Sequence, residues 1–438
     1  CSGGSIPVRF PERALAALAL LTLAASAQDA PKLARSYADS PTLAARNALI
    51  NYAASHKDVN GGLARLALAA KDAKDARRSA EALRQLQAAG PLLPQLADIV
   101  DWISATVAFE ARDFGSTARY CEALLKRPLK SPVSGSAAVL AARAYIGAGN
   151  PAKAVELLAR HQADLPQPEG DAALAGAYDA MNDSAHAVVY DQRVWLNYPT
   201  SAEAQGAEAE LRKHRQEMGS DYPEPSAQAL LARAGKLLDA RQYDPARREL
   251  TAISQRFTGA ARELALVRIG DAMRRNRKDA SSLDYLASLQ LSSPEADAER
   301  LYQTVAAARR FNRLDVMEGA VDRLTRRYPN SEWRQQALVA AGNEYLLRND
   351  VAQYEPLYRA CFAAFPRIGQ AAYCHWKVAF RAYLENRKEA ADLLREQVRD
   401  YPESEAASAA MYYLGRMAER AGAHSDARAW YDHLQRSF

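Results

Sequence analysis

The sequence Tyr-Pro-Glu-Ser-Glu-Ala at residues 401–406 recurs as Tyr-Pro-Asn-Ser-Glu-Trp at 328–333 and as Tyr-Pro-Thr-Ser-Ala-Glu at 198–203. Proline cannot continue a preceding helix, and a serine two residues later can accept hydrogen bonds from the free N–H groups of the next helix. Each copy therefore predicts the end of one helix and the beginning of another.

The aromatic residues in front of three prolines set a repeat length. Tyr328, Phe365 and Tyr401 lie 37 and 36 residues apart, and a further 37 residues lead to Phe438, the last residue. Two helices in a period of this size are typical of a tetratricopeptide-like α-α solenoid, whose units bury their apolar faces only against neighbours. We therefore expect an all-α superhelix of about eleven helix pairs. Because the last repeat is interrupted at Phe438, we expect the sequence to be part of a larger protein.

Small residues stand where helices of this repeat type pack tightly. They are Ala142, Ala154, Ala187, Ala390 and Ala427. Met317 and Tyr354 occupy the matching place in two other units, so the repeats are degenerate. Runs of the β-branched residues that favour strands are sparse, which also indicates helices.

A joint between two arms is expected at residues 218–226, where one Gly and two Pro separate helical patterns. We place an N-terminal helical repeat arm at residues 28–217 and a C-terminal arm at residues 226–438.

The first residues have the features of an export signal. Arg9 and Arg13 precede an apolar run from 14 to 25, and Ala-Ser-Ala at 25–27 has the small-x-small pattern of a secretory cleavage site. We therefore predict a signal peptide at residues 1–27 and a periplasmic mature chain. The alternative is a buried first helix.

Charge and histidine spacing exclude several kinds of site. Removing the signal peptide lowers the formal net charge from +5 to +4, and no basic stripe is concentrated enough for nucleic-acid binding. The seven histidines are scattered. None has the spacing to another His, a Cys pair or a paired carboxylate that zinc sites use, so neither a metal site nor a cofactor is predicted.

Three cysteines, Cys121, Cys361 and Cys374, remain after export, and an odd number cannot pair completely within one chain. Cys361 and Cys374 fall on the second helix of one unit and the first helix of the next, which are packed neighbours. Their positions allow a disulfide, and a pair of buried thiols is the alternative.

One stripe on the last unit is a candidate binding surface. Tyr412, Arg416 and Arg420 recur every fourth residue on its first helix, so they share a face that can hold a sugar ring and acidic substituents. The alternative is a solvated face on which Glu419 offsets the charge. Residues 373–383 also carry several aromatic side chains, and their helical spacing indicates mostly core positions.

The C-terminal third resembles a known family. The segments are His-Trp-Lys-Val-Ala-Phe-Arg-Ala-Tyr at 375–383, Arg-Asp-Tyr-Pro at 399–402, Met-Tyr-Tyr-Leu-Gly-Arg-Met-Ala-Glu-Arg at 411–420, and Ala-Arg-Ala-Trp-Tyr at 427–431 through Leu434 to Phe438. Over about 370–438 they resemble the region just upstream of the catalytic domain in soluble lytic murein transglycosylases.

The resemblance implies an exported enzyme of cell-wall turnover. In that family a long helical superstructure forms a ring or horseshoe around a peptidoglycan glycan strand, and a C-terminal lysozyme-like domain in cis cleaves the strand with a single Glu. Neither the family's Glu-Ser motif in its lysozyme-like setting nor its Gly-Leu-Met-Gln segment is present, so no catalytic residue is carried over. The chain is then the inactive, glycan-guiding scaffold. The alternative is a non-enzymatic envelope repeat protein that binds other envelope proteins.

Overall fold

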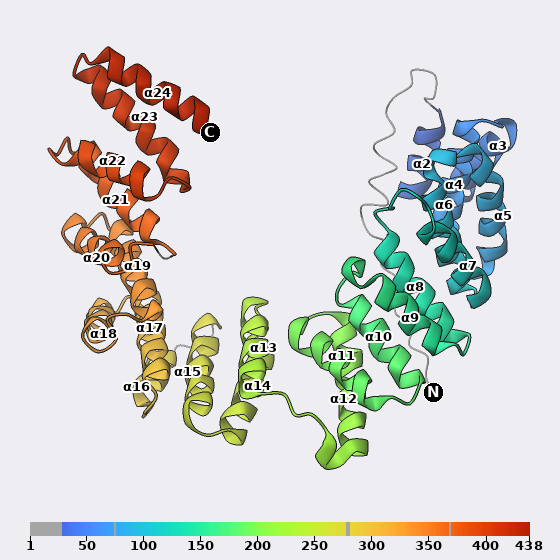
Figure 1. The fold of residues 1–438 in the computed structure, drawn as a ribbon, viewed down its shortest axis with the longest axis horizontal. Coiled ribbons are helices and arrows are strands. Elements are labelled where there is room, and N and C mark those ends of the chain that lie inside the picture. The colour runs from blue at the N-terminus through green and yellow to red at the C-terminus, as the bar shows by residue number, and fades with distance from the viewer. Residues whose placement is uncertain (1–28, 74–75, 277–280, 368) are drawn as a thin grey trace. The chain divides into compact units, whose positions relative to one another are not determined.

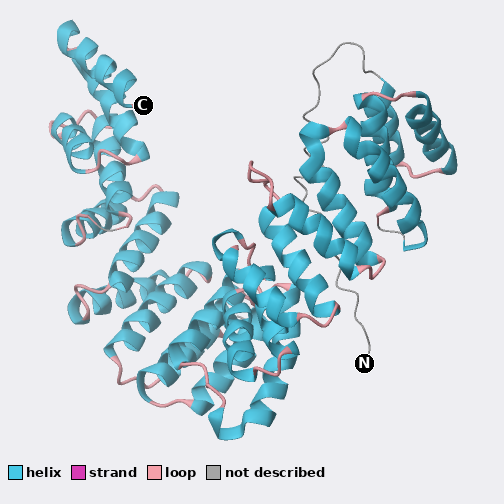
Figure 2. Cartoon of the chain, turned by 45° about the vertical axis from the view of Figure 1, so that its right-hand side comes forward, coloured by secondary structure: helices cyan, strands magenta, loops and turns pink. Residues whose placement is uncertain are grey.

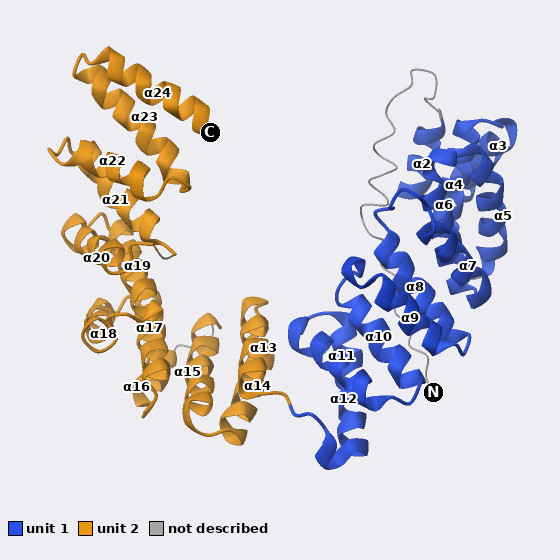
Figure 3. Ribbon diagram, viewed as in Figure 1, with its two compact units in different colours: residues 1–224 blue, residues 225–438 orange. Residues whose placement is uncertain are grey.

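The computed structural model describes residues 29–73, 76–276, 281–367 and 369–438. All regular structure within these ranges is helical, which confirms the predicted all-α class (Figure 2). The chain divides into two compact units, residues 1–224 and residues 225–438 (Figure 3). The predicted signal peptide at 1–27 lies outside the described residues.

Unit 1 holds the helices from α2 to α12 (Figure 1). They are α2 (Asp29–Asp39), α3 (Leu43–Ser55), α4 (Val59–Asp72), α5 (Ser79–Ala89), α6 (Ala97–Glu110), α7 (Phe114–Leu125), α8 (Ser134–Gly147), α9 (Pro151–Arg160), α10 (Glu169–Ala180), α11 (Ser184–Asn197) and α12 (Ala202–Met218). Short 3-10 turns lie at η1 (Ala76–Arg78), η2 (Gly90–Leu92), η3 (Pro94–Leu96), η4 (Gln162–Asp164) and η5 (Gly219–Asp221).

Unit 2 holds the helices from α13 to α24. They are α13 (Ala227–Asp239), α14 (Tyr243–Arg256), α15 (Gly259–Arg275), α16 (Ser282–Ser288), α17 (Pro294–Arg310), α18 (Leu314–Arg327), α19 (Glu332–Leu347), α20 (Val351–Ala364), α21 (Ala371–Leu384), α22 (Ala390–Asp400), α23 (Glu405–Arg420) and α24 (His424–Ser437).

The helices pack as stacked hairpins within each unit. Consecutive helices such as α6 and α7, or α23 and α24, pair with each other. The first helix of a pair also packs on the first helix of the next pair, as α8 does on α10 and α17 does on α19. This is the tetratricopeptide-like α-α solenoid arrangement that the repeat length predicted.

A residue in the left-handed conformation ends the first helix of many pairs. In the turn before α20, Asn349 has φ 55°, and the next amide, of Asp350, donates to the carbonyl of Tyr345 at 2.9 Å. This five-residue closure is a Schellman C-cap, and Asn or Gly tolerates its positive φ best. Equivalent positive-φ residues stand at Arg112, Gly149, Asn182, Arg241, Asn312, Asn386 and Gly422.

The small-residue positions of the repeat frame are buried as expected. Ala154, Ala187 and Ala390 have no exposed surface, and the same is true of Met317, the larger residue in one of these places. Gly342 on α19 shows why the contact is tight, because a Cβ added there would lie 2.6 Å from Cε1 of Tyr358 on α20.

The serines of the Tyr-Pro segments differ in their capping role. Ser201 and Ser331 accept hydrogen bonds from the amides of Ala204 and Trp333, at 3.1 and 3.2 Å. Ser404 makes no such bond, so the capping expectation is wrong there. Its Oγ accepts instead from the buried amide of Gln397 at 3.2 Å and donates to the carbonyl of Tyr401. The buried side-chain amide of Gln397 needs an acceptor, and Ser404 serves it instead of capping α23.

Across the described residues, no single helix is both long and apolar enough to cross a membrane. The segments Ser79–Leu92 and Pro94–Glu110 reach the required length and composition only together, and the chain bends by 119° between them.

Candidate functional site

Aromatic side chains of α21 and α23 form a continuous cluster in unit 2. The rings of Trp376 and Phe380 stack with centroids 5.0 Å apart, and Tyr413 lies 5.1 Å from Phe380 and 6.2 Å from Trp376. Tyr412 packs edge-on against Tyr413 at 5.3 Å. None of these four is fully buried, and Tyr412 is 40% exposed. We call Trp376, Phe380, Tyr412 and Tyr413 the aromatic face.

The prediction that residues 373–383 are mostly core is only partly right. Tyr383 is buried, but Tyr373 is 36% exposed. Trp376 and Phe380 pack against the core and are only partly buried. Their spacing of four residues places both on one helix face, which is the signal that identifies an aromatic surface as well as a core stripe.

Of the three predicted binding residues, Tyr412 belongs to the aromatic face and Arg416 lies beside it. Arg416 donates a hydrogen bond to the Oη of Tyr412 at 3.3 Å, so these two residues are brought together. Arg420 places its guanidinium 5.4 Å from the centre of the Tyr383 ring. The Nε of Arg416 also lies 3.4 Å from the carboxylate of Glu419, so part of its charge is offset, as the alternative interpretation supposed.

This arrangement suits a flat, polar ligand that also carries negative charge. Aromatic faces offer large apolar contact area with little conformational entropy to lose, and Arg416 adds a cation that can pair with a carboxylate. Sequence spacing identified the arginines and Tyr412. It missed Trp376, Phe380 and Tyr413, because the packing of α21 on α23 is what joins them.

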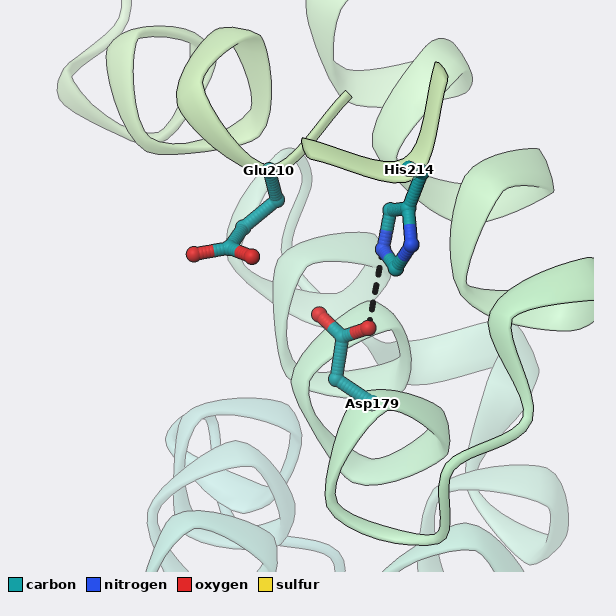
Figure 4. Close-up of side chains that lie close together, drawn as sticks. All are labelled: Asp179, Glu210 and His214. Atoms are coloured by element: carbon teal, nitrogen blue, oxygen red, sulfur yellow. Dashed lines mark ion pairs between the residues drawn. The ribbon is translucent and has the colours of Figure 1, made fainter. Parts of the chain in front are cut away.

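A second polar cluster lies in unit 1, where Asp179 of α10 approaches Glu210 and His214 of α12 (Figure 4). One potential ligand atom from each residue lies within 4.8 Å of the others. Nε2 of His214 is 2.9 Å from Oδ1 of Asp179, although the contact lacks hydrogen-bond geometry. His214 is only 1% exposed, so its ring is held inside the unit.

Negative charge is concentrated around this cluster. Burial raises the pKa of Asp179, and although His214 acts to lower it, the nearby carboxylate of Glu210 adds to the rise. Asp191 on α11 is 5% exposed, and burial together with the charges of Asp179 and Glu210 raises its pKa to about 7. The positive charge of Lys213 offsets part of this negative charge, since its Nζ lies 3.6 Å from the carboxylate of Glu210.

The sequence contains a signal for this cluster that the search for zinc-like histidine spacing missed. Glu210 and His214 are four residues apart, so they share one face of α12. Asp179 comes from a different helix and joins them only through the packing of α10 on α12. His214 therefore has two potential ligand neighbours that the zinc-spacing criteria did not cover, and the prediction of no metal site stays untested.

Comparisons with known proteins leave the family open. No protein-family model matches the sequence, and no curated protein matches it. Among solved structures, the chain is similar to the "Structure of Naa15/Naa10 bound to HypK-THB", with 15% identity over 92% of this chain and 67% of that chain. The TM-score is 0.28, which is too low to support an inference about this protein.

Proposed function

We propose that this tetratricopeptide-like helical scaffold guides peptidoglycan glycan strands for an exported lytic transglycosylase. The aromatic face, with Arg416 beside it, is the observation that carries the proposal. The same residues lie within the stretch of about 370–438 that resembles the segment preceding the catalytic domain in that family. Both lines of support therefore concern α21 and α23.

The chemistry of the two partners is complementary. The sugar rings of a glycan strand have apolar faces that can stack on Trp376 or Tyr412, and the stem peptides carry carboxylates that Arg416 can pair with. Exposed ion pairs contribute little in water, so the aromatic contacts are expected to supply most of the affinity. Binding is therefore expected to be weak and only moderately dependent on salt.

Because the resemblance carries over no catalytic residue, we expect binding without cleavage. Cleaving a glycosidic bond needs an acid or base within hydrogen-bond reach of the bridging oxygen. In the proposal, a lysozyme-like domain in cis supplies that group, and export to the periplasm brings the scaffold to its substrate.

Co-sedimentation with purified, insoluble peptidoglycan tests the proposal. The bound fraction of the full chain should fall at least about threefold in Trp376→Ala and in the double variant Tyr412→Ala/Arg416→Ala, as expected from losing about 1 kcal/mol of stacking. Arg395→Ala, which removes an equally charged and 57% exposed side chain from α22, should bind like the parent chain.

The outcomes separate the two functions. Binding that the face variants do not change, or no binding at all, contradicts a glycan-guiding role. Release of anhydro-muropeptides by this chain alone contradicts the assignment of catalysis to another domain. Binding of an extended peptide without binding of peptidoglycan favours the protein-binding scaffold.

A further inference from the structure

We propose that Asp179, Glu210 and His214 bind a divalent transition-metal ion, with zinc the best match, and thereby link α10 to α12 in unit 1. This site is separate from the aromatic face, which belongs to unit 2.

The three side chains already have nearly the spacing of a coordination sphere. Zinc holds nitrogen and oxygen ligands at about 2.0–2.2 Å, which puts tetrahedral ligand atoms roughly 3.4 Å apart. The distance between His214 and Asp179 is 2.9 Å, and all three ligand atoms lie within 4.8 Å of one another. Glu210 is 46% exposed, and its contact with Lys213 is weak enough to let the carboxylate turn inward.

The buried ring of His214 contacts Asp179 without making a well-aligned hydrogen bond. Neither ring nitrogen has a hydrogen bond within the part of the chain that the structure describes, although the side chain is 1% exposed. Its Nδ1 lies 3.8 Å from Glu217, too far for a hydrogen bond. Burying a polar atom without a hydrogen bond is costly, and coordination would give Nε2 a bond in place of that contact.

Asp191 adds a third carboxyl group to the surroundings of the cluster. Its carboxyl group comes from α11, is 5% exposed, and has one oxygen, Oδ2, without a hydrogen-bond partner among the described residues. It lies close enough to Asp179 and Glu210 to interact with their charges. A cation held by Asp179 and Glu210 would offset the negative charge near this buried carboxyl group.

The ligand types favour a transition metal over calcium or magnesium. Imidazole suits Zn²⁺ and its neighbours, whereas Ca²⁺ and Mg²⁺ prefer six or more oxygen ligands. Three protein ligands would leave a fourth position open for water.

Zinc binding by the untagged full chain tests the proposal, measured by competition with a chromophoric chelator. We expect one ion per chain. Glu210→Gln and His214→Gln should each weaken zinc binding by at least about tenfold. Replacing a residue that only orients a metal ligand already costs about that much affinity, so losing a ligand should cost no less. Glu208→Gln is the matched control, because it removes the same charge from an exposed position of the same helix and should leave the affinity unchanged.

Two further measurements exclude other sites and a loss of folding. The absorption of the Co²⁺ complex should lack a thiolate charge-transfer band, which separates this site from the cysteines. Zinc should raise the thermal midpoint of the parent chain but not that of Glu210→Gln. Because the side chain of Glu210 is half-exposed, we expect this variant to fold. Binding that survives both ligand variants, a thiolate band, or no binding at one ion per chain overturns the proposal.

Discussion

The Sγ atoms of Cys361 and Cys374 lie 2.8 Å apart, between α20 and α21. Both side chains are fully buried, and both are thiols in the structure. The thiol of Cys374 donates to that of Cys361, and this hydrogen bond raises the pKa of Cys374 and lowers that of Cys361. The expected placement on neighbouring helices of consecutive units is thus confirmed.

This proximity predicts a disulfide in an oxidising environment. Incubation with oxidised glutathione should join Cys361 to Cys374, as two thiols lose two protons and two electrons and glutathione disulfide becomes two thiols. Alkylation under denaturing conditions, followed by peptide mass spectrometry, should then label Cys121 but not Cys361 or Cys374. Cys121 is the internal control, because burial raises its pKa to about 12 and it has no neighbouring thiol in the described residues. Alkylation of Cys361 and Cys374 after oxidation contradicts the prediction.

The repeat frame was predictable because its signals are local. The Pro of each Tyr-Pro segment ends a helix wherever it occurs, so Tyr328 and Tyr401 mark helix boundaries before any tertiary contact is known. The left-handed Asn349 is equally local, and its recurrence 37 residues after Asn312 and before Asn386 is a second record of the same period. Chain-local chemistry therefore determines where helices begin and end.

The candidate sites were less predictable because they depend on which helix faces meet. Asp179 and His214 are 35 residues apart, and only the packing of α10 on α12 brings them together. Trp376 and Tyr413 join in the same way across α21 and α23. A helical spacing shows that residues share a face, but it does not show what the facing helix presents.

The close approach of Gly342 to Tyr358 predicts a large effect from one methyl group. Gly342→Ala should destabilise unit 2 by about 1–3 kcal/mol, because the ring of Tyr358 lies 2.6 Å from where the new Cβ would stand. Urea unfolding followed by far-ultraviolet circular dichroism measures the change.

Gly319 on α18 offers a matched control for that substitution. It is also helical, but an added Cβ would meet no atom within 4 Å. Gly319→Ala should therefore stabilise the chain by about 0.5–1 kcal/mol through better helix propensity. Equal effects at the two positions would show that the Gly342 contact is not tight.

Glu122 on α7 predicts how stability depends on pH. Its carboxylate accepts a hydrogen bond from Tyr145 of α8 and pairs with Lys153 of α9 at 3.2 Å. Chiefly through the bond from Tyr145, the pKa of Glu122 is lowered from 4.5 to about 2. A carboxyl group whose pKa is lower in the folded state stabilises the fold when it is ionised.

The stabilisation is therefore complete above pH 4.5 and is lost as the pH falls from there towards 2. Glu122→Gln should cost about 1 kcal/mol at pH 7, a value reduced because the side chain is 29% exposed and partly screened. The difference from the parent chain should shrink in urea unfolding experiments at successively lower pH below 4.5.

Glu156→Gln is the control, since Glu156 is 63% exposed and pairs across one helical turn with Arg160. Its cost should stay below about 0.5 kcal/mol. The prediction is contradicted if the difference in unfolding free energy between Glu122→Gln and the parent chain grows as the pH falls. The hydrogen bond from Tyr145 would then not favour the ionised form of Glu122.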